Sequence, residues 1–158
     1  KYKKENVERS GVIFCDYSLE EKKKPRINKT LTKILKQYSQ EKIEHVTHQF
    51  DFGLSHSECF NIAESLLNKY ATAKLVITTR IHCALPCLAL GTPVILVVKK
   101  YDKKRYNGLI QLLNVVGYSR HKLFINKVLY NKNNEVINSE KFKPIANNLK
   151  QKVFNWKK

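Results

Sequence analysis

Residues 75–98, with the sequence LVITTRIHCALPCLALGTPVILVV, constrain the fold more than any other part of the chain. Two apolar, β-branched runs flank an apolar helix candidate at 81–90, which Gly91 closes and Pro93 keeps from continuing. Strands joined through a helix by such short connections must be parallel, and strands this apolar are buried on both faces. The sequence therefore predicts a βαβ unit whose two strands lie side by side in the middle of a sheet, with the helix covering one face.

The remaining patterns extend this unit into an alternation of strands and helices. Ser55 followed by Glu58 is typical of a capping box at the start of a helix, and Pro144 suits the first turn of a last helix. Strands are predicted over 11–17, 42–50 and within 121–128, loops over 20–26 and 130–139, and helices over 30–39, 55–73, 109–116 and 140–156. This order predicts an α/β fold, a Rossmann-like three-layer sandwich around a mostly parallel sheet of four or five strands. We expect residues 1–10 to be a charged lead or linker and residues 11–158 to form one domain.

The net charge of +17 is unevenly distributed along the chain. Residues 99–158 carry 15 basic and 3 acidic side chains, whereas the segment 43–98 is nearly neutral. Such an excess favours anionic partners, among them phosphates, acidic glycans, nucleic acid and an anionic membrane surface. No apolar run approaches the roughly 20 residues that a membrane span needs, and no secretory leader precedes the first strand. We therefore expect a cytoplasmic protein, with peripheral contact at the inner face of a membrane compatible with its charge.

The chain begins with Lys1 and contains no methionine. A natural translation product normally begins with methionine, so we expect this sequence to be a piece of a longer protein or a processed one. In that case part of an active site lies outside it.

Several common catalytic and cofactor motifs are absent from the sequence. There is no glycine-rich dinucleotide fingerprint, no P-loop, no GxSxG and no HExxH. The cysteines at 15, 59, 83 and 87 lack CxxC spacing, so we expect them to pack in the core rather than to form disulfides or a zinc site. His45 and His48 lie three apart on a predicted strand and so point to opposite faces, which argues against a metal ion held by both. We expect neither a metal nor a bound cofactor.

The chemically active side chains of the βαβ unit gather where its first strand meets its helix. The first turn of a helix exposes unpaired N–H groups and the positive end of the helix dipole, which attract anions. Thr78 and Thr79 offer hydroxyl groups there, and Arg80 can bind phosphate or carboxylate through two hydrogen bonds. His82 can exchange a proton near neutral pH. This corner is therefore a candidate site that binds an anion and transfers a proton.

The motif Thr78-Thr79-Arg80-Ile81-His82, followed by an apolar helix, Gly-x-Pro and a strand, resembles the signature of the polysaccharide pyruvyl transferase family. The basic loop YDKKRYNGL, residues 101–109, also resembles the usual continuation, and the resemblance spans about residues 62–118. It implies the C-terminal half of a two-domain, GT-B-like transferase of polysaccharide biosynthesis, inactive without its N-terminal domain. The implied reaction transfers a pyruvyl group from phosphoenolpyruvate to a pair of glycan hydroxyls. Arg80 would hold the donor and His82 would be the acid and base, with further anion contacts from Lys103, Lys104 and Arg105.

Two other functions stay open from the sequence alone. The first is a GT-B glycosyltransferase that uses a nucleotide sugar, in which Glu58 or Asp51 would bind the ribose. The second is a basic nucleic-acid-binding module, in which tyrosines interleaved with lysines would stack on bases. These tyrosines are Tyr101, Tyr106, Tyr118 and Tyr130. No RRM, KH or zinc-finger signature supports the second alternative. Neither the acceptor glycan nor the oligomeric state follows from the sequence.

Overall fold

A computed structural model describes residues 8–19, 24–50, 53–100, 106, 108–119 and 121–156 of the chain. The binding candidates Asp51, Tyr101, Lys103, Lys104 and Arg105 lie outside the described residues. The anion contacts predicted for the basic loop therefore stay predictions.

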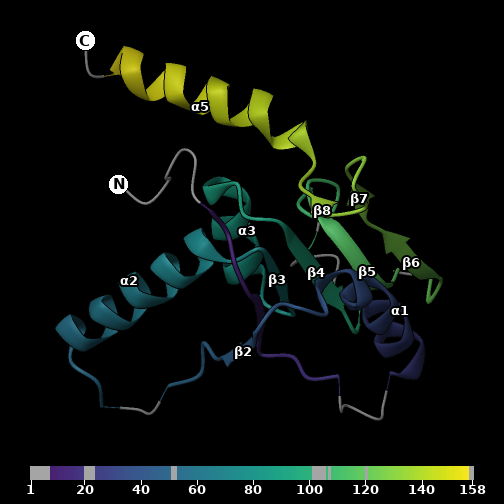
Figure 1. Ribbon diagram of the computed structural model, residues 1–158. Helices are drawn as coiled ribbons and strands as arrows, with labels where there is room; N and C mark the ends of the chain where they lie inside the picture. The colour runs from purple at the N-terminus through teal and green to yellow at the C-terminus, as the bar shows by residue number, and fades with distance from the viewer. Residues whose placement is uncertain are drawn as a thin grey trace.

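The centre of the molecule is a six-stranded sheet in the order β2-β1-β3-β4-β5-β6 (Figure 1). The first five strands in this order are parallel, and β6 pairs antiparallel with β5 at one edge. The strands are β1 (Val12–Cys15), β2 (Ile43–Val46), β3 (Leu75–Thr78), β4 (Val94–Val98), β5 (Asn114–Tyr118) and β6 (Phe124–Lys127). The mostly parallel α/β sheet predicted from the sequence is confirmed, with five parallel strands and an added antiparallel one.

Helices cover the sheet on both faces and complete three layers. Helix α1 (Pro25–Leu35), continued by the 3₁₀ turn η1 (Lys36–Tyr38), packs its buried Ile27 and Leu31 on one face. Helices α2 (His56–Thr72) and α3 (Ile81–Leu90) cover the other face. Alternate residues of each central strand enter the two cores, as the period of two in a strand requires.

The βαβ unit has the arrangement that its sequence predicts. Strands β3 and β4 are parallel neighbours with Val76 opposite Val94, and every residue of both strands is buried. Helix α3 ends at Gly91, whose φ of 74° lies in the left-handed region that glycine adopts without steric cost. The absence of charge in these strands is therefore explained by their central position, where neither face meets water.

Two predicted boundaries shift in the structure. Helix α1 begins at Pro25, five residues earlier than expected. Proline fits the first helical turn because the N–H groups of that turn have no intrahelical acceptor, so the N–H that proline lacks costs no hydrogen bond. Strand β2 ends at Val46, so His48 lies beyond it rather than on it. The capping box of α2 is confirmed: Ser55 accepts a hydrogen bond from the Glu58 backbone, and the Glu58 side chain accepts one from Ser55.

The helix predicted over 109–116 is wrong, because Asn114–Tyr118 is strand β5. The apolar run before this strand fits a helix, but Val115 and Val116 are β-branched, which favours a strand. Both valines pair with β4, whose other neighbour in the sheet is β3, so β5 fills the remaining edge of β4. Gly117 lies so close to β4 that a Cβ there would stand 2.1 Å from the Val98 carbonyl oxygen. Gly117 therefore allows β4 and β5 to approach each other closely.

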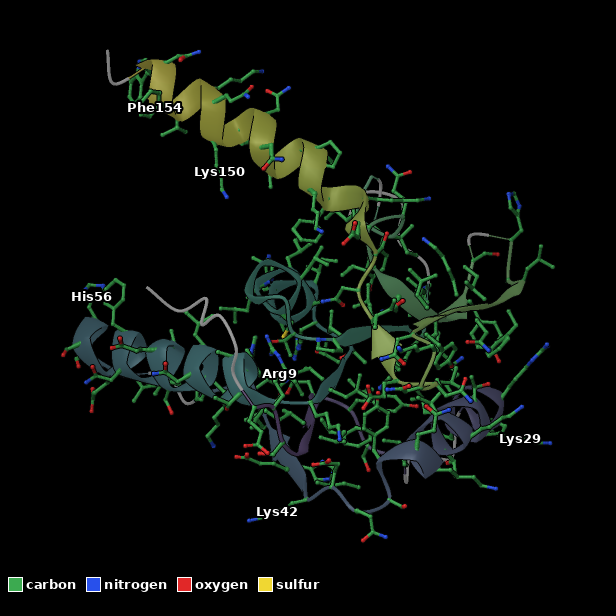
Figure 2. The ribbon with its side chains drawn as sticks, turned by 45° about the horizontal axis from the view of Figure 1, so that its top comes forward. Arg9, Lys29, Lys42, His56, Lys150 and Phe154 are labelled. Carbon is green, nitrogen blue, oxygen red and sulfur yellow. The ribbon has the colours of Figure 1, made fainter. Side chains whose placement is uncertain are left out.

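Arg9, just before β1, binds the C-terminal ends of two helices through hydrogen bonds. Its guanidinium donates hydrogen bonds to the carbonyls of Ala71 (3.0 Å) and Leu90 (3.1 Å) and to the hydroxyl of Thr92. Ala71 and Leu90 lie in the last turns of α2 and α3, where carbonyl oxygens lack intrahelical donors. One cation thus satisfies two helix ends, and Figure 2 shows Arg9 beside them.

The C-terminal part leaves the sheet. The segment predicted as a loop at 130–139 contains the small hairpin of β7 (Leu129–Tyr130) and β8 (Val136–Ile137), and a 3₁₀ turn η2 (Glu140–Phe142) precedes α5 (Lys143–Trp156). The predicted last helix is confirmed, but none of its residues is buried. In Figures 1 and 2, α5 stands away from the other elements, with Lys150 and Phe154 on it. Within the described part of the chain, no helix combines the length and the hydropathy needed to cross a membrane.

Candidate functional site

The candidate site lies at the carboxyl edge of the sheet, where the direction of chain progression reverses. From β1 the chain moves outward to β2, and it then returns past β1 to β3. Between two such strands the following loops diverge to opposite faces and leave a crevice in which open parallel sheets bind ligands. Asp16 follows β1 and Arg80 follows β3, so both residues stand at this reversal.

Asp16 is the hub of this edge. Its carboxylate accepts hydrogen bonds from Arg80 Nε (2.8 Å), the Thr47 hydroxyl (2.6 Å) and the His48 backbone N–H (3.2 Å). Its side chain is 10 % exposed, and burial alone would raise the pKa of this carboxyl group. The three hydrogen bonds and the Arg80 charge outweigh that effect and lower the pKa of Asp16. A carboxylate thus joins the ends of β1, β2 and β3.

Arg80 is held at this edge through its Nε atom. Its Nε contacts Asp16, and its side chain is 37 % exposed. Among the residues that the structure describes, Asp16 is the one acidic partner of this guanidinium. Fixing an arginine through Nε leaves its terminal amino groups as donors of known position, which suits binding of a phosphate or carboxylate.

The two threonines of the motif shape the turn before α3. Thr78 is fully buried, and its hydroxyl accepts the Arg80 backbone N–H at 2.9 Å. The Thr79 hydroxyl donates to the Asp16 backbone carbonyl at 3.1 Å. Both hydroxyls thus hold the loops that carry Asp16 and Arg80, and contact of these threonines with a donor stays a prediction.

His82 is exposed on the first turn of α3 and borders a cavity of about 320 Å³. No side chain caps α3, and within its first turn the Cys83 N–H donates to the Arg80 carbonyl at 3.1 Å. The cavity lies between α2 and α3 and is mostly apolar, with His48 and Tyr70 as its other polar residues near His82. Arg80 is not among the residues that line it. His82 therefore shares this cavity with the imidazole of His48 and not with the guanidinium of Arg80.

His48 joins this edge to the protein interior. Its Nε2 lies 2.8 Å from the Tyr70 hydroxyl, which also donates to Cys15 Sγ at 3.5 Å. Burial lowers the pKa of His48, and Arg80 and His82 lower it further against the pull of Asp16. These effects together favour the neutral form of the His48 imidazole. His45 stacks on Phe14 with ring centroids 5.3 Å apart, so the two histidines have different surroundings.

The cysteines divide into two groups. Cys15, Cys83 and Cys87 are buried as expected, whereas Cys59 is exposed on α2, which corrects the prediction for that residue. Glu58, a candidate ribose ligand in the nucleotide-sugar alternative, is engaged in the capping box of the same helix. Its side chain is accounted for by that local role.

The sequence does not single out Asp16, and it brings His48 to notice only as a metal ligand paired with His45. Asp16 adopts a positive φ of 53°, and an acidic residue directly after an apolar strand is a signal that could have been read. His48 carries no local signal, because its neighbours Tyr70 and Cys15 come from other elements.

Comparison with known proteins agrees with the motif. The family model described as Polysaccharide pyruvyl transferase matches residues 2–101, which include β1 to β4 and the Arg80-x-His82 motif. Searches of curated proteins and of solved structures give no significant match. A match over more than half of the chain, which includes the residues of the edge just described, shows that the chain belongs to the polysaccharide pyruvyl transferase family.

Proposed function

We propose that this transferase-family chain binds phosphoenolpyruvate at the carboxyl edge of its sheet and supports transfer of the pyruvyl group to two hydroxyls of a glycan. The observation that carries the proposal is the placement of Arg80, which Asp16 fixes through Nε at the β1/β3 reversal. Phosphoenolpyruvate carries a phosphate and a carboxylate, the two groups that an arginine fork binds best.

The reaction itself needs proton transfer, which explains the value of a histidine nearby. The methylene carbon of the enol gains a proton, two sugar hydroxyls bond to the central carbon and lose theirs, and the carbon–oxygen bond to phosphate breaks. The products are a ketal and inorganic phosphate, which takes up the remaining proton. His82 is exposed at the N-terminus of α3 and is the group that we assign to this acid and base role.

The donor is tested by calorimetric titration of the chain with phosphoenolpyruvate. Arg80→Gln should weaken binding about 10- to 100-fold, because a charge-assisted hydrogen bond contributes roughly 1.5–3 kcal/mol. Arg26→Gln is the matched control, since Arg26 lies on α1 against the Phe124 ring and away from the site. Equal affinity of the parent chain and Arg80→Gln would contradict the donor assignment, and binding of a nucleotide sugar in place of phosphoenolpyruvate would favour a glycosyltransferase.

The role of His82 is tested in a preparation that shows pyruvyl transfer. His82→Gln should lower turnover by about a hundredfold or more, the usual contribution of general acid–base catalysis. It should leave the affinity for phosphoenolpyruvate and the melting temperature nearly unchanged, because His82 is exposed. Unchanged turnover together with a lower melting temperature would show that His82 is structural.

A further inference from the structure

Three side chains that bind soft metals meet behind the candidate site. Cys15 is the last residue of β1, Cys83 lies in the first turn of α3, and His48 follows β2. The two sulfur atoms and an imidazole nitrogen all lie within 4.8 Å of one another. Three elements that are distant in sequence therefore bring two thiols and one imidazole to a single point.

The surroundings of this cluster suit a metal ion. Both thiols are fully buried within an apolar core, and His48 is half-buried. The Tyr70 hydroxyl contacts two of the three groups, at 3.5 Å from Cys15 Sγ and 2.8 Å from His48 Nε2. His48 and Tyr70 also line the cavity between α2 and α3, so a fourth ligand position can be filled by the Tyr70 oxygen or by water from that cavity.

The thiols of Cys15 and Cys83 stand in an apolar core, where two thiolates without a cation would be unpaired buried charges. A divalent cation that displaces both protons would be neutralised by two thiolates, so the bound cluster would place no net charge in the core.

We propose that Cys15, Cys83 and His48 form a zinc site that neither the family match nor the motif assigns. Two thiolates and one neutral imidazole, with one position open, are a known ligand set of zinc and are softer than the oxygen ligands that magnesium or calcium requires. Zinc there would connect the end of β1, the loop after β2 and the first turn of α3. Asp16 and Arg80 lie close to these ligands in the sequence.

Cobalt substitution gives a direct readout. The chain is reduced, freed of metal with a chelator and titrated with Co²⁺. We expect one equivalent to produce a thiolate-to-cobalt charge-transfer band and the intense visible bands of tetrahedral cobalt, and one equivalent of Zn²⁺ to abolish them. Calorimetry with Zn²⁺ in buffers of different ionisation enthalpy should show release of about two protons, one from each thiol.

Single substitutions identify the ligands. Cys15→Ala, Cys83→Ala and His48→Gln should each lower zinc affinity by more than the roughly 10- to 100-fold that loss of an outer-shell partner costs. Cys59→Ala is the matched control with unchanged affinity, since Cys59 is exposed and does not belong to the cluster. His48→Gln alters a half-buried side chain, so it keeps the test decisive if a buried cysteine variant fails to fold.

Three results would overturn the proposal. Cobalt spectra without thiolate bands would show binding elsewhere on the chain. Zinc affinity unchanged in His48→Gln and Cys83→Ala would show the same. A thiol count of two in the untreated protein, with Cys15 and Cys83 disulfide-bonded, would show that oxidation rather than metal binding uses this pair. All of these measurements are made without phosphoenolpyruvate, so they stand apart from the proposed transferase function.

Discussion

Replacing Asp16 by asparagine removes the charge at the hub of the sheet edge and keeps the shape of the side chain. The carboxylate accepts hydrogen bonds from Arg80, Thr47 and the His48 backbone, and an amide that turns its NH₂ toward any of these donors loses that bond. Asparagine also tolerates the positive φ of 53° at this position, so backbone strain does not enter the comparison.

The expected loss is about 2 kcal/mol of unfolding free energy at pH 7. Hydrogen bonds to a charged group contribute roughly 1.5–3 kcal/mol each, but the Arg80 side chain is 37 % exposed and its share is screened toward the 1 kcal/mol or less of a surface pair. Thr47 is exposed as well, which reduces its share. Urea unfolding followed by circular dichroism measures the difference, and a double-mutant cycle with Arg80→Gln should give a coupling of about 0.5–1 kcal/mol.

The pH dependence gives the stricter test. The folded-state pKa of Asp16 is lowered, so its contribution is fully present above the unfolded-state pKa of about 3.9 and is lost as the pH falls through the folded value. The parent chain and Asp16→Asn should therefore converge in stability in acid. Glu44→Gln, which removes an exposed pair with Lys69, is the control and should change stability by less than about 0.5 kcal/mol. A difference that persists unchanged in acid, or none at pH 7, would refute the hub role.

Three further substitutions test the packing of the fold in the same urea assay. Gly117→Ala should cost at least about 1–3 kcal/mol, because its Cβ would meet the Val98 carbonyl oxygen at 2.1 Å, and a stability equal to the parent would mean that β4 and β5 are not this close. Ser55→Ala should cost about 1 kcal/mol through loss of the capping box, and the loss should be absent if α2 begins elsewhere. Tyr38→Phe should cost about 1–3 kcal/mol, because it leaves the buried Val136 N–H without its acceptor at 2.9 Å, and a neutral result would show that the β7–β8 hairpin is not anchored there.

The parts of the fold that could be predicted are those whose signal is local. Strands β3 and β4 and helix α3 follow from an apolar run bounded by Gly91 and Pro93, and α2 follows from Ser55 and Glu58. Strand β5 was mistaken for a helix because its valines follow a run with helical spacing, and only the unpaired edge of β4 decides between the two. The local pattern contains no information about that edge.

The site divides in the same way. Arg80 and His82 could be found because a strand-to-helix junction in a parallel sheet marks a ligand site, and the motif lies there. Asp16 and His48 acquire their roles only when β1, β2 and β3 are placed in the order β2-β1-β3. The prediction of a last helix is confirmed, but nothing in its sequence indicates that its apolar side chains, among them Leu149 and Trp156, remain exposed.

The hydrogen bonds of Arg9 have a mechanical consequence. They connect the residues just before β1 to the last turns of two helices, through the carbonyls of Ala71 and Leu90. Helix α3 is ten residues long, about 15 Å from end to end, and its other end presents His82. The Arg9 side chain therefore helps to fix the far end of the helix whose first turn carries His82.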